Sequence, residues 1–179
     1  MVRCFAWMFG LLFLASAVVE ASPVNLLKNP DLADLDNRGK LVGWSMRKEA
    51  ATTTAEGEFR TGGQGVKFVH PVSEYSSISQ NVSVKPNTVY TATAWMKGES
   101  IVPEADKGCA MARLFIGKPG TGSTLKSSTT MKGTFDWQKV TVTFDSGEFD
   151  RITFTVYLHK ATGTLWADEM MLVEGEPTP

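Results

Sequence analysis

Cysteine is scarce in this chain of 179 residues, which contains only Cys4 and Cys109. Cys4 lies in an N-terminal stretch that we expect to be removed, so the remaining chain has no second thiol for an internal disulfide. Cys109 is interpreted as a small residue in or near a loop, with a reactive or intermolecular thiol as the alternative. The fold is therefore expected to depend on packing, and a chain of this length can bury a core in one domain.

An excess of charge of either sign is also missing. The formal net charge is -1, the pI is near 6.1, and Lys and Arg are scattered rather than clustered. Because proteins bind the backbone of nucleic acids through basic patches, this composition argues against a nucleic-acid partner.

The residue patterns of common catalytic sites do not occur either. His70 and His159 are the only histidines, and neither has a metal ligand at a suitable spacing. There is no Gly-x-Ser-x-Gly sequence, and the glycine-rich stretch at 117–124 lacks the order of a phosphate-binding loop. A glycosidase needs two carboxylates across a cleft, whereas only Asp168 and Glu169 fall in the interior of a predicted strand. We expect a protein that is not an enzyme.

The one long apolar run, "FAWMFGLLFLASAVV", is too short for a spanning helix, which needs about 20 residues. It follows a positively charged start and precedes the small residues of "VVEAS". We interpret residues 1–21 as a signal peptide that is cleaved after Ala21, with cleavage after Ala17 or an uncleaved membrane anchor as alternatives. The protein is then secreted, to the extracellular space or the periplasm, and leaves the membrane after cleavage.

Helical periodicity is absent from the rest of the chain, where Gly, Thr, Ser and Val recur throughout. Short runs with alternating apolar residues are separated by turn sequences such as "KPN" and "KATG". This pattern predicts an all-β domain over 22–175, a two-sheet antiparallel β-sandwich or jelly roll, followed by a frayed tail at 176–179. The predicted strands are 66–70, 77–84, 88–98, 111–118, 137–145, 151–159 and 164–174.

The alternation within these strands places unusual residues on the face opposite the core. In "ITFTVYLH" at 152–159, the apolar residues share one parity, and the other parity carries threonines, a tyrosine and a histidine. Three further strands, within 88–98, 111–118 and 137–145, behave in the same way. The residues predicted to point outward from these strands are Trp95, Lys97, Arg113, Phe115, Tyr157 and His159.

If these strands lie side by side, the outward residues form one surface, and aromatic rings beside hydrogen-bonding groups suit a sugar chain. We expect Trp95 and Tyr157, with Phe115 or Tyr75, to stack on sugar rings. Hydrogen bonds are expected from Arg113, Lys97, His159 and Gln80. Three alternatives stay open: a second layer covers this face, His159 is only an exposed edge residue, and Gln80 points inward with Ile78 and Val82.

Four stretches, in this order, resemble motifs of the carbohydrate-binding modules of families four, nine and twenty-two. They are "NLLKNPDLADLDNRGKLVGW" (25–44), "SVKPNTVYTATAWMKG" (83–98), "FDWQKVTVTF" (135–144) and "GTLWADEMML" (163–172). The resemblance implies a galactose-binding-like jelly roll that is non-catalytic and holds glycan on the concave face of one sheet or on edge loops.

The resemblance also implies a structural calcium ion near the chain ends. The acid of the closing motif matches Asp168, which is the first candidate ligand. The opening motif departs from the family, because Leu32-Ala33 replaces the usual Phe-Glu. Asp31 and Asp34 are therefore the candidates for a second ligand.

The sequence thus predicts a secreted, monomeric, non-catalytic protein whose partner is a polysaccharide or oligosaccharide. The alternative is an adhesion or accessory module of the same fold that contacts protein or cell-surface material and has no sugar site.

Overall fold

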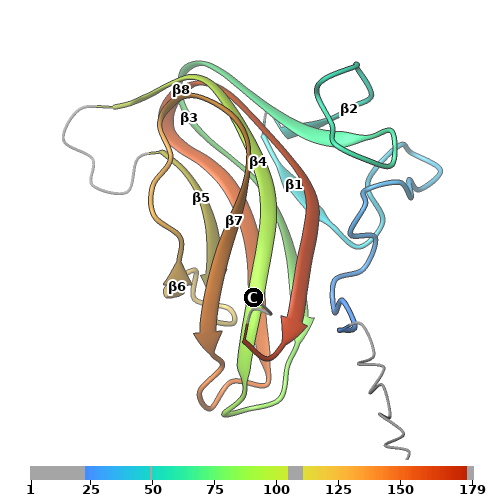
Figure 1. Ribbon diagram of the computed structural model, residues 1–179, viewed down its shortest axis with the longest axis vertical. Coiled ribbons are helices and arrows are strands. Elements are labelled where there is room, and N and C mark those ends of the chain that lie inside the picture. The colour runs from blue at the N-terminus through green and yellow to red at the C-terminus, as the bar shows by residue number, and fades with distance from the viewer. Residues whose placement is uncertain (1–22, 49, 105–110, 177–179) are drawn as a thin grey trace, which may run out of the picture.

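The structure is a computed structural model that describes residues 23–48, 50–104 and 111–176, and this part of the chain contains strands and no helix (Figure 1). The predicted signal peptide, Cys109 and the last three residues lie outside the described residues. The strands are β1 (Ser45–Arg47), β2 (Ala50–Thr53), β3 (Gly65–Ser83), β4 (Val89–Pro103), β5 (Met111–Gly117), β6 (Thr124–Ser127), β7 (Gly133–Asp145) and β8 (Arg151–Glu174).

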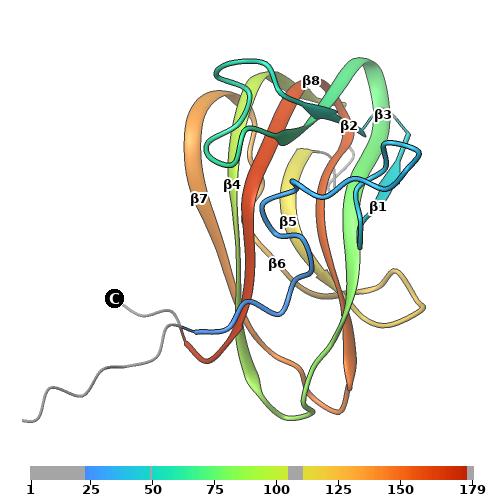
Figure 2. The same cartoon turned by 90° about the vertical axis from the view of Figure 1, so that its right-hand side faces the viewer.

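The strands pack as two layers, and all strand pairs are antiparallel (Figure 2). One layer, here called the groove layer, contains β6, β5, the first part of β8, the second part of β3 and β1. The other, the back layer, contains β7, β4, the second part of β8, the first part of β3 and β2. The predicted antiparallel β-sandwich is confirmed.

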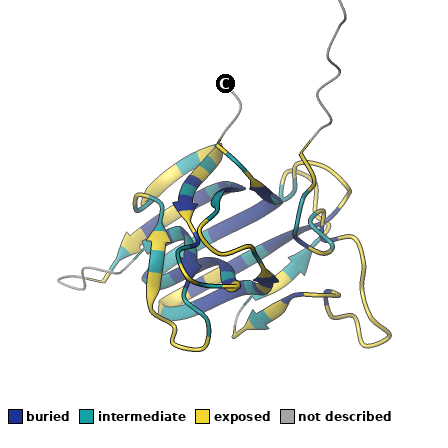
Figure 3. Cartoon of the chain, turned by 90° about the horizontal axis from the view of Figure 1, so that it is seen from below, coloured by how far each residue is buried: buried dark blue, intermediate teal, exposed yellow. Residues whose placement is uncertain are grey.

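The core lies between the layers and is made by the predicted apolar parity of each strand (Figure 3). Because successive side chains of a strand point to opposite faces, each strand contributes every second residue to the core. Burial of these side chains supplies the main stabilisation of the sandwich, whose described residues include no cysteine. The fully buried members include Tyr90, Phe68, Phe154, Ile78, Met96, Leu114, Ile116, Ile152, Leu158 and Leu165.

Strands β3 and β8 are longer than predicted, because each continues from one layer into the other. The sequence predicts a turn at 160–163 between two strands, and this prediction is wrong: β8 bends there without ending. Lys160 and Gly163 have φ angles of 46° and 110°, which bend the chain, and β3 has register shifts between His70 and Tyr75 at the same level. The two bent strands join the layers into one hydrogen-bonded network.

The segment before β1 closes the sandwich at the N-terminal end. The Leu26 amide donates to the Leu172 carbonyl at 2.8 Å, and the Asn25 side chain bonds to the backbone of Met170 and Leu172. The indole of Trp44 is buried edge-on against Phe154 and donates to a backbone carbonyl. The opening stretch of the sequence is therefore held against its closing strand.

Candidate functional site

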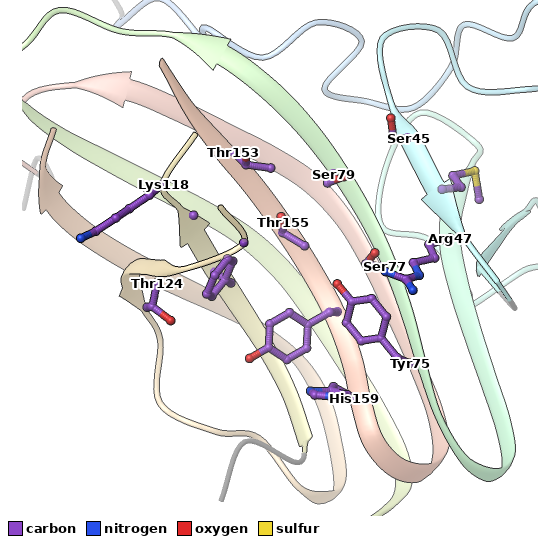
Figure 4. Close-up of a pocket in the computed structure, with 15 residues that line it drawn as sticks. Ser45, Arg47, Tyr75, Ser77, Ser79, Lys118, Thr124, Thr153, Thr155 and His159 are labelled. Atoms are coloured by element: carbon purple, nitrogen blue, oxygen red, sulfur yellow. The ribbon is translucent and has the colours of Figure 1, made fainter. Parts of the chain in front are cut away.

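The outer face of the groove layer carries a pocket of about 610 Å³, here called the groove (Figure 4). Strands β3 and β8 form its floor, β1 forms one side, and β5, β6 and the loop between them form the other. The residues that line it are Ser45, Met46, Arg47, Tyr75, Ser77, Ser79, Phe115, Gly117, Lys118, Gly122, Thr124, Thr153, Thr155, Tyr157 and His159.

The strand register arranges these residues in rows across the layer. Tyr75 of β3 is paired with His159 of β8, and Ser77 is paired with Tyr157. On its other side, the first part of β8 pairs with β5, where Thr155 lies opposite Phe115. Because paired residues in neighbouring strands point to the same face, side chains far apart in sequence meet in one surface.

Three aromatic rings form a continuous platform in the groove. The ring centroids of Tyr75 and Tyr157 lie 6.1 Å apart, and those of Phe115 and Tyr157 lie 5.9 Å apart. The imidazole of His159 stands edge-on to Tyr75, at 5.0 Å between centroids and 82° between planes. Tyr157 is 8 % exposed and the other rings are half-buried, so the platform presents apolar surface in a sheltered position.

Hydroxyl groups surround this platform. Ser77 and Ser79 of β3 and Thr153 and Thr155 of β8 lie on the floor between the two sides of the groove (Figure 4). Each hydroxyl can donate one hydrogen bond and accept others. Burial, reinforced by the charge of Lys160, holds the pKa of His159 below its usual value of 6.5. The imidazole is therefore a neutral donor and acceptor at neutral pH.

The structure brings four of the predicted sugar-contact residues into the groove: Tyr75, Phe115, Tyr157 and His159. Arg113 lies on the same face, paired with Tyr157, but it is not among the lining residues. Its Nη1 atom lies 3.5 Å from the Ser127 hydroxyl, and its Nε atom is buried without a hydrogen-bond partner.

The prediction that Trp95 and Lys97 share this surface is wrong. Both lie on β4, which pairs with β7 and with the second part of β8 and so belongs to the back layer. The Arg60 guanidinium covers the Trp95 ring at 3.5 Å from its centroid. The Lys97 ammonium donates to the Gly57 carbonyl and lies 5.2 Å from the Trp166 ring. Strand parity gave the correct side of the strand, but parity does not specify which layer a strand joins.

Gln80 does not contact the groove, and the inward alternative is confirmed. The side chain is 6 % exposed and lies on the core side of β3. It accepts a hydrogen bond from the Lys28 amide at 2.7 Å and donates to the Lys28 carbonyl at 3.0 Å. Its amide therefore holds the N-terminal segment against the sandwich.

The candidate calcium ligands do not form an open ligand set. Asp168 is fully buried, and its carboxylate accepts hydrogen bonds from the backbone amides of Arg60, Thr61 and Glu169. Burial raises the pKa of this carboxyl, although the three amides act in the opposite direction. Asp31 and Asp34 are exposed. In the part of the chain that the structure describes, no three His, Cys, Asp or Glu side chains are grouped to hold a metal ion.

Several groove residues were not predicted from the sequence. Arg47 lies in β1, whose three residues are too short to show a pattern, and Lys118 follows β5 in a loop. Ser77 and Ser79 could have been found, because they share the parity of Tyr75 and alternate with the buried Ile78.

No family model matches the chain. It is 30% identical over 146 residues to Exochitinase 1 of Streptomyces olivaceoviridis, in a match that covers 79% of this chain. The chain spans 22% of the length of that curated relative.

In the described residues, no helix is long and apolar enough to cross a membrane.

Solved structures with similar folds include several carbohydrate-binding modules. A family 61 module in complex with β-1,4-galactotriose superposes with a TM-score of 0.62 and 21% identity, covering 85% of this chain and 99% of that one. A family 4 module gives 0.59 and 14%, covering 83% and 99%. The family 22 xylan-binding domain of Paenibacillus barcinonensis Xyn10C gives 0.58 and 14%, covering 89% and 100%. The chain therefore has the β-sandwich fold of carbohydrate-binding modules, and the resemblance seen in its sequence is confirmed at the level of the fold.

Proposed function

We propose that this protein is a secreted, monomeric carbohydrate-binding module that holds a polysaccharide or oligosaccharide in the groove and has no catalytic activity. The observation that carries the proposal is the platform of Tyr75, Tyr157 and Phe115 among the hydroxyl groups of β3 and β8. The faces of sugar rings present C–H groups and their edges present hydroxyls, so an apolar platform bordered by polar side chains matches both parts.

A binding role is favoured over hydrolysis by the chemistry of the lining. No Asp or Glu is among the described residues that line the groove. Hydrolysis of a glycosidic bond ordinarily uses a pair of carboxyl groups on either side of the bond. The groove offers stacking and hydrogen bonding but lacks this pair.

The comparisons support the same proposal. The similar folds include a module bound to β-1,4-galactotriose and a xylan-binding domain, and the curated relative is an exochitinase of which this chain spans one part. A module attached to, or acting beside, an enzyme on an extracellular polysaccharide would fit these neighbours. Galactan, xylan and chitin are accordingly the first glycans to test.

Affinity electrophoresis and isothermal titration calorimetry with these glycans test the proposal. The Tyr75→Ala variant is expected to lose about tenfold or more in affinity, because truncation of an aromatic contact residue commonly costs about 2 kcal/mol. Trp95→Ala is the matched control, since it removes an aromatic side chain from the back layer, and its affinity should stay within about twofold of the wild type.

Two results would contradict the proposal. If no polysaccharide retards the wild-type protein, the adhesion or accessory module without a sugar site becomes the better description. If Trp95→Ala loses affinity and Tyr75→Ala does not, a glycan is bound on the back layer rather than in the groove. Thermal unfolding of both variants checks that the fold is intact.

A further inference from the structure

The charge of the groove has one sign. The charged residues that line it are Arg47 and Lys118, and the described lining residues include no carboxylate. His159 is also present, and its pKa is held below the usual value, so it adds no charge at neutral pH. The chain as a whole has a formal net charge of -1. The positive charge is therefore a local property of the groove and not a consequence of a basic protein.

Within the described residues, these cations form no ion pairs. The ion pairs among the described residues join Lys48 to Glu74, Arg60 to Glu169, Lys67 to Glu58 and Lys85 to Glu174. Glu74 precedes Tyr75 in the chain, but its carboxylate forms an ion pair with the Lys48 ammonium at 2.5 Å. Neither Arg47 nor Lys118 appears in any of these pairs, so both can attract an anion from solution.

Arg113 adds a third cation to the same face. It is paired across the strands with Tyr157 and has no ion pair among the described residues, and its Nη1 atom lies 3.5 Å from the Ser127 hydroxyl. Its half-buried position on the groove face contributes positive potential although it does not line the groove.

The position of Arg47 suits a carboxylate on a stacked sugar. Its guanidinium lies over the Tyr75 ring, 4.9 Å from the ring centroid, so the positive charge and the aromatic platform are adjacent. Guanidinium groups bind carboxylates with two parallel hydrogen bonds. Lys118 lies on the opposite side of the groove, and its side chain points away from the floor (Figure 4). Its ammonium is 5.8 Å from the centroid of the Phe149 ring. A charged glycan in the groove would therefore have a cation on each side.

We propose that the groove prefers an acidic glycan, in which the carboxylate of a uronic acid residue pairs with Arg47 while a neighbouring sugar stacks on Tyr75 or Tyr157. Lys118 attracts the same chain from the other side. This inference rests on the proposed function, because it names the class of glycan that the same groove would bind.

The test compares two forms of one polymer that differ in charge, and adds two other charged polymers. Glucuronoxylan and its carboxyl-reduced form are titrated into the wild-type protein by calorimetry, with a sulfated galactan and cationic chitosan as further ligands. We expect the native glucuronoxylan to bind about tenfold more tightly than the reduced polymer. The difference should shrink when salt is raised from about 0.05 M to about 0.5 M, because salt screens exposed charges.

Variants locate the effect. Arg47→Ala is expected to remove most of the preference for the native polymer, because it should lower affinity for the native polymer about tenfold and affinity for the reduced polymer by much less. Lys118→Ala should give a smaller loss in the same direction. Arg38→Ala and Lys132→Ala are matched controls, because both residues are exposed and neither lines the groove, and they should leave the preference unchanged.

The outcomes separate this inference from the proposed function. Equal affinity for the native and reduced polymers, or equal losses for Arg47→Ala and Arg38→Ala, would overturn the acidic preference and leave glycan binding intact. Tighter binding of the sulfated galactan than of glucuronoxylan would overturn the assignment to a carboxylate. Tighter binding of chitosan would overturn the role of the cations. If the protein binds none of these glycans and binds neither the neutral galactan nor chitin, both proposals are contradicted.

Discussion

Tyr75 and His159 lie 84 positions apart in sequence, yet their rings are in edge-to-face contact in the groove. At the scale of single residues, the period-two alternation placed Phe115, Tyr157 and His159 on the correct side of their strands. The same rule left two interpretations of Gln80, which shares the parity of the core. A polar side chain there is either a sugar-binding residue at an exposed edge or an internal hydrogen-bonding group. Its two bonds to Lys28 decide for the second.

His159 leads to a prediction about pH. Because its pKa in the folded protein is below 6.5, the native state disfavours the protonated imidazole. Its contribution to the free energy of unfolding is therefore complete above about pH 6.5 and is lost as the pH falls through the lower pKa of the folded state. We expect urea denaturation to show that the wild type loses more stability between about pH 7 and pH 5 than His159→Gln does.

The comparison between the two proteins isolates this group, because all other titrating residues are shared. Equal losses of stability in the wild type and in His159→Gln would show that the imidazole is as well solvated in the folded chain as in the unfolded one.

At the scale of elements, β3 and β8 determine the architecture, since each supplies strands to both layers. The bend of β8 requires Gly163, whose φ of 110° is unfavourable for residues with a side chain. A Cβ atom there would lie 2.5 Å from the Ser100 carbonyl oxygen and 2.8 Å from that of Glu99. The residue is therefore held in place by the backbone of β4 as well as by its own conformation.

Gly163→Ala is expected to lower the free energy of unfolding by roughly 2 to 4 kcal/mol, because it combines an unfavourable φ with a backbone clash. Gly147→Ala is the control, since Gly147 has a φ of 57° and nothing lies within 4 Å of its added Cβ. That variant should lose only about 1 kcal/mol. Chemical denaturation measures both values, and equal losses would show that β4 moves away to accommodate the new methyl group.

At the scale of the whole molecule, the N-terminal segment and the last strand are joined by hydrogen bonds and by the buried Trp44 rather than by a disulfide. The sequence resemblance implies a calcium ion, whereas the contacts of its candidate ligand lead to a different expectation. Asp168 is the candidate ligand, and its two oxygens already accept three backbone amides. This arrangement satisfies the buried carboxylate without a cation.

We therefore expect a chelator such as EDTA to leave the Tm of the purified protein unchanged, and added calcium to have no effect on it. Differential scanning calorimetry makes the measurement, with Asp168→Asn as a second sample whose Tm should fall because it loses an acceptor for buried amides. A rise of several degrees with calcium in the wild type, absent in Asp168→Asn, would instead establish the metal site.

By itself, the sequence determined the all-β class, the apolar parity of each strand and the outward side of Tyr157, Phe115 and His159. These properties depend on local periodicity, which each strand carries within its own residues. Only the tertiary structure decided which strands are neighbours. It shows that Trp95 and Lys97 belong to the back layer. It also shows that Arg47 and Lys118 line the groove. The reason is physical: pairing between strands distant in the chain is set by how the two layers bury their common core, and no single strand contains that information.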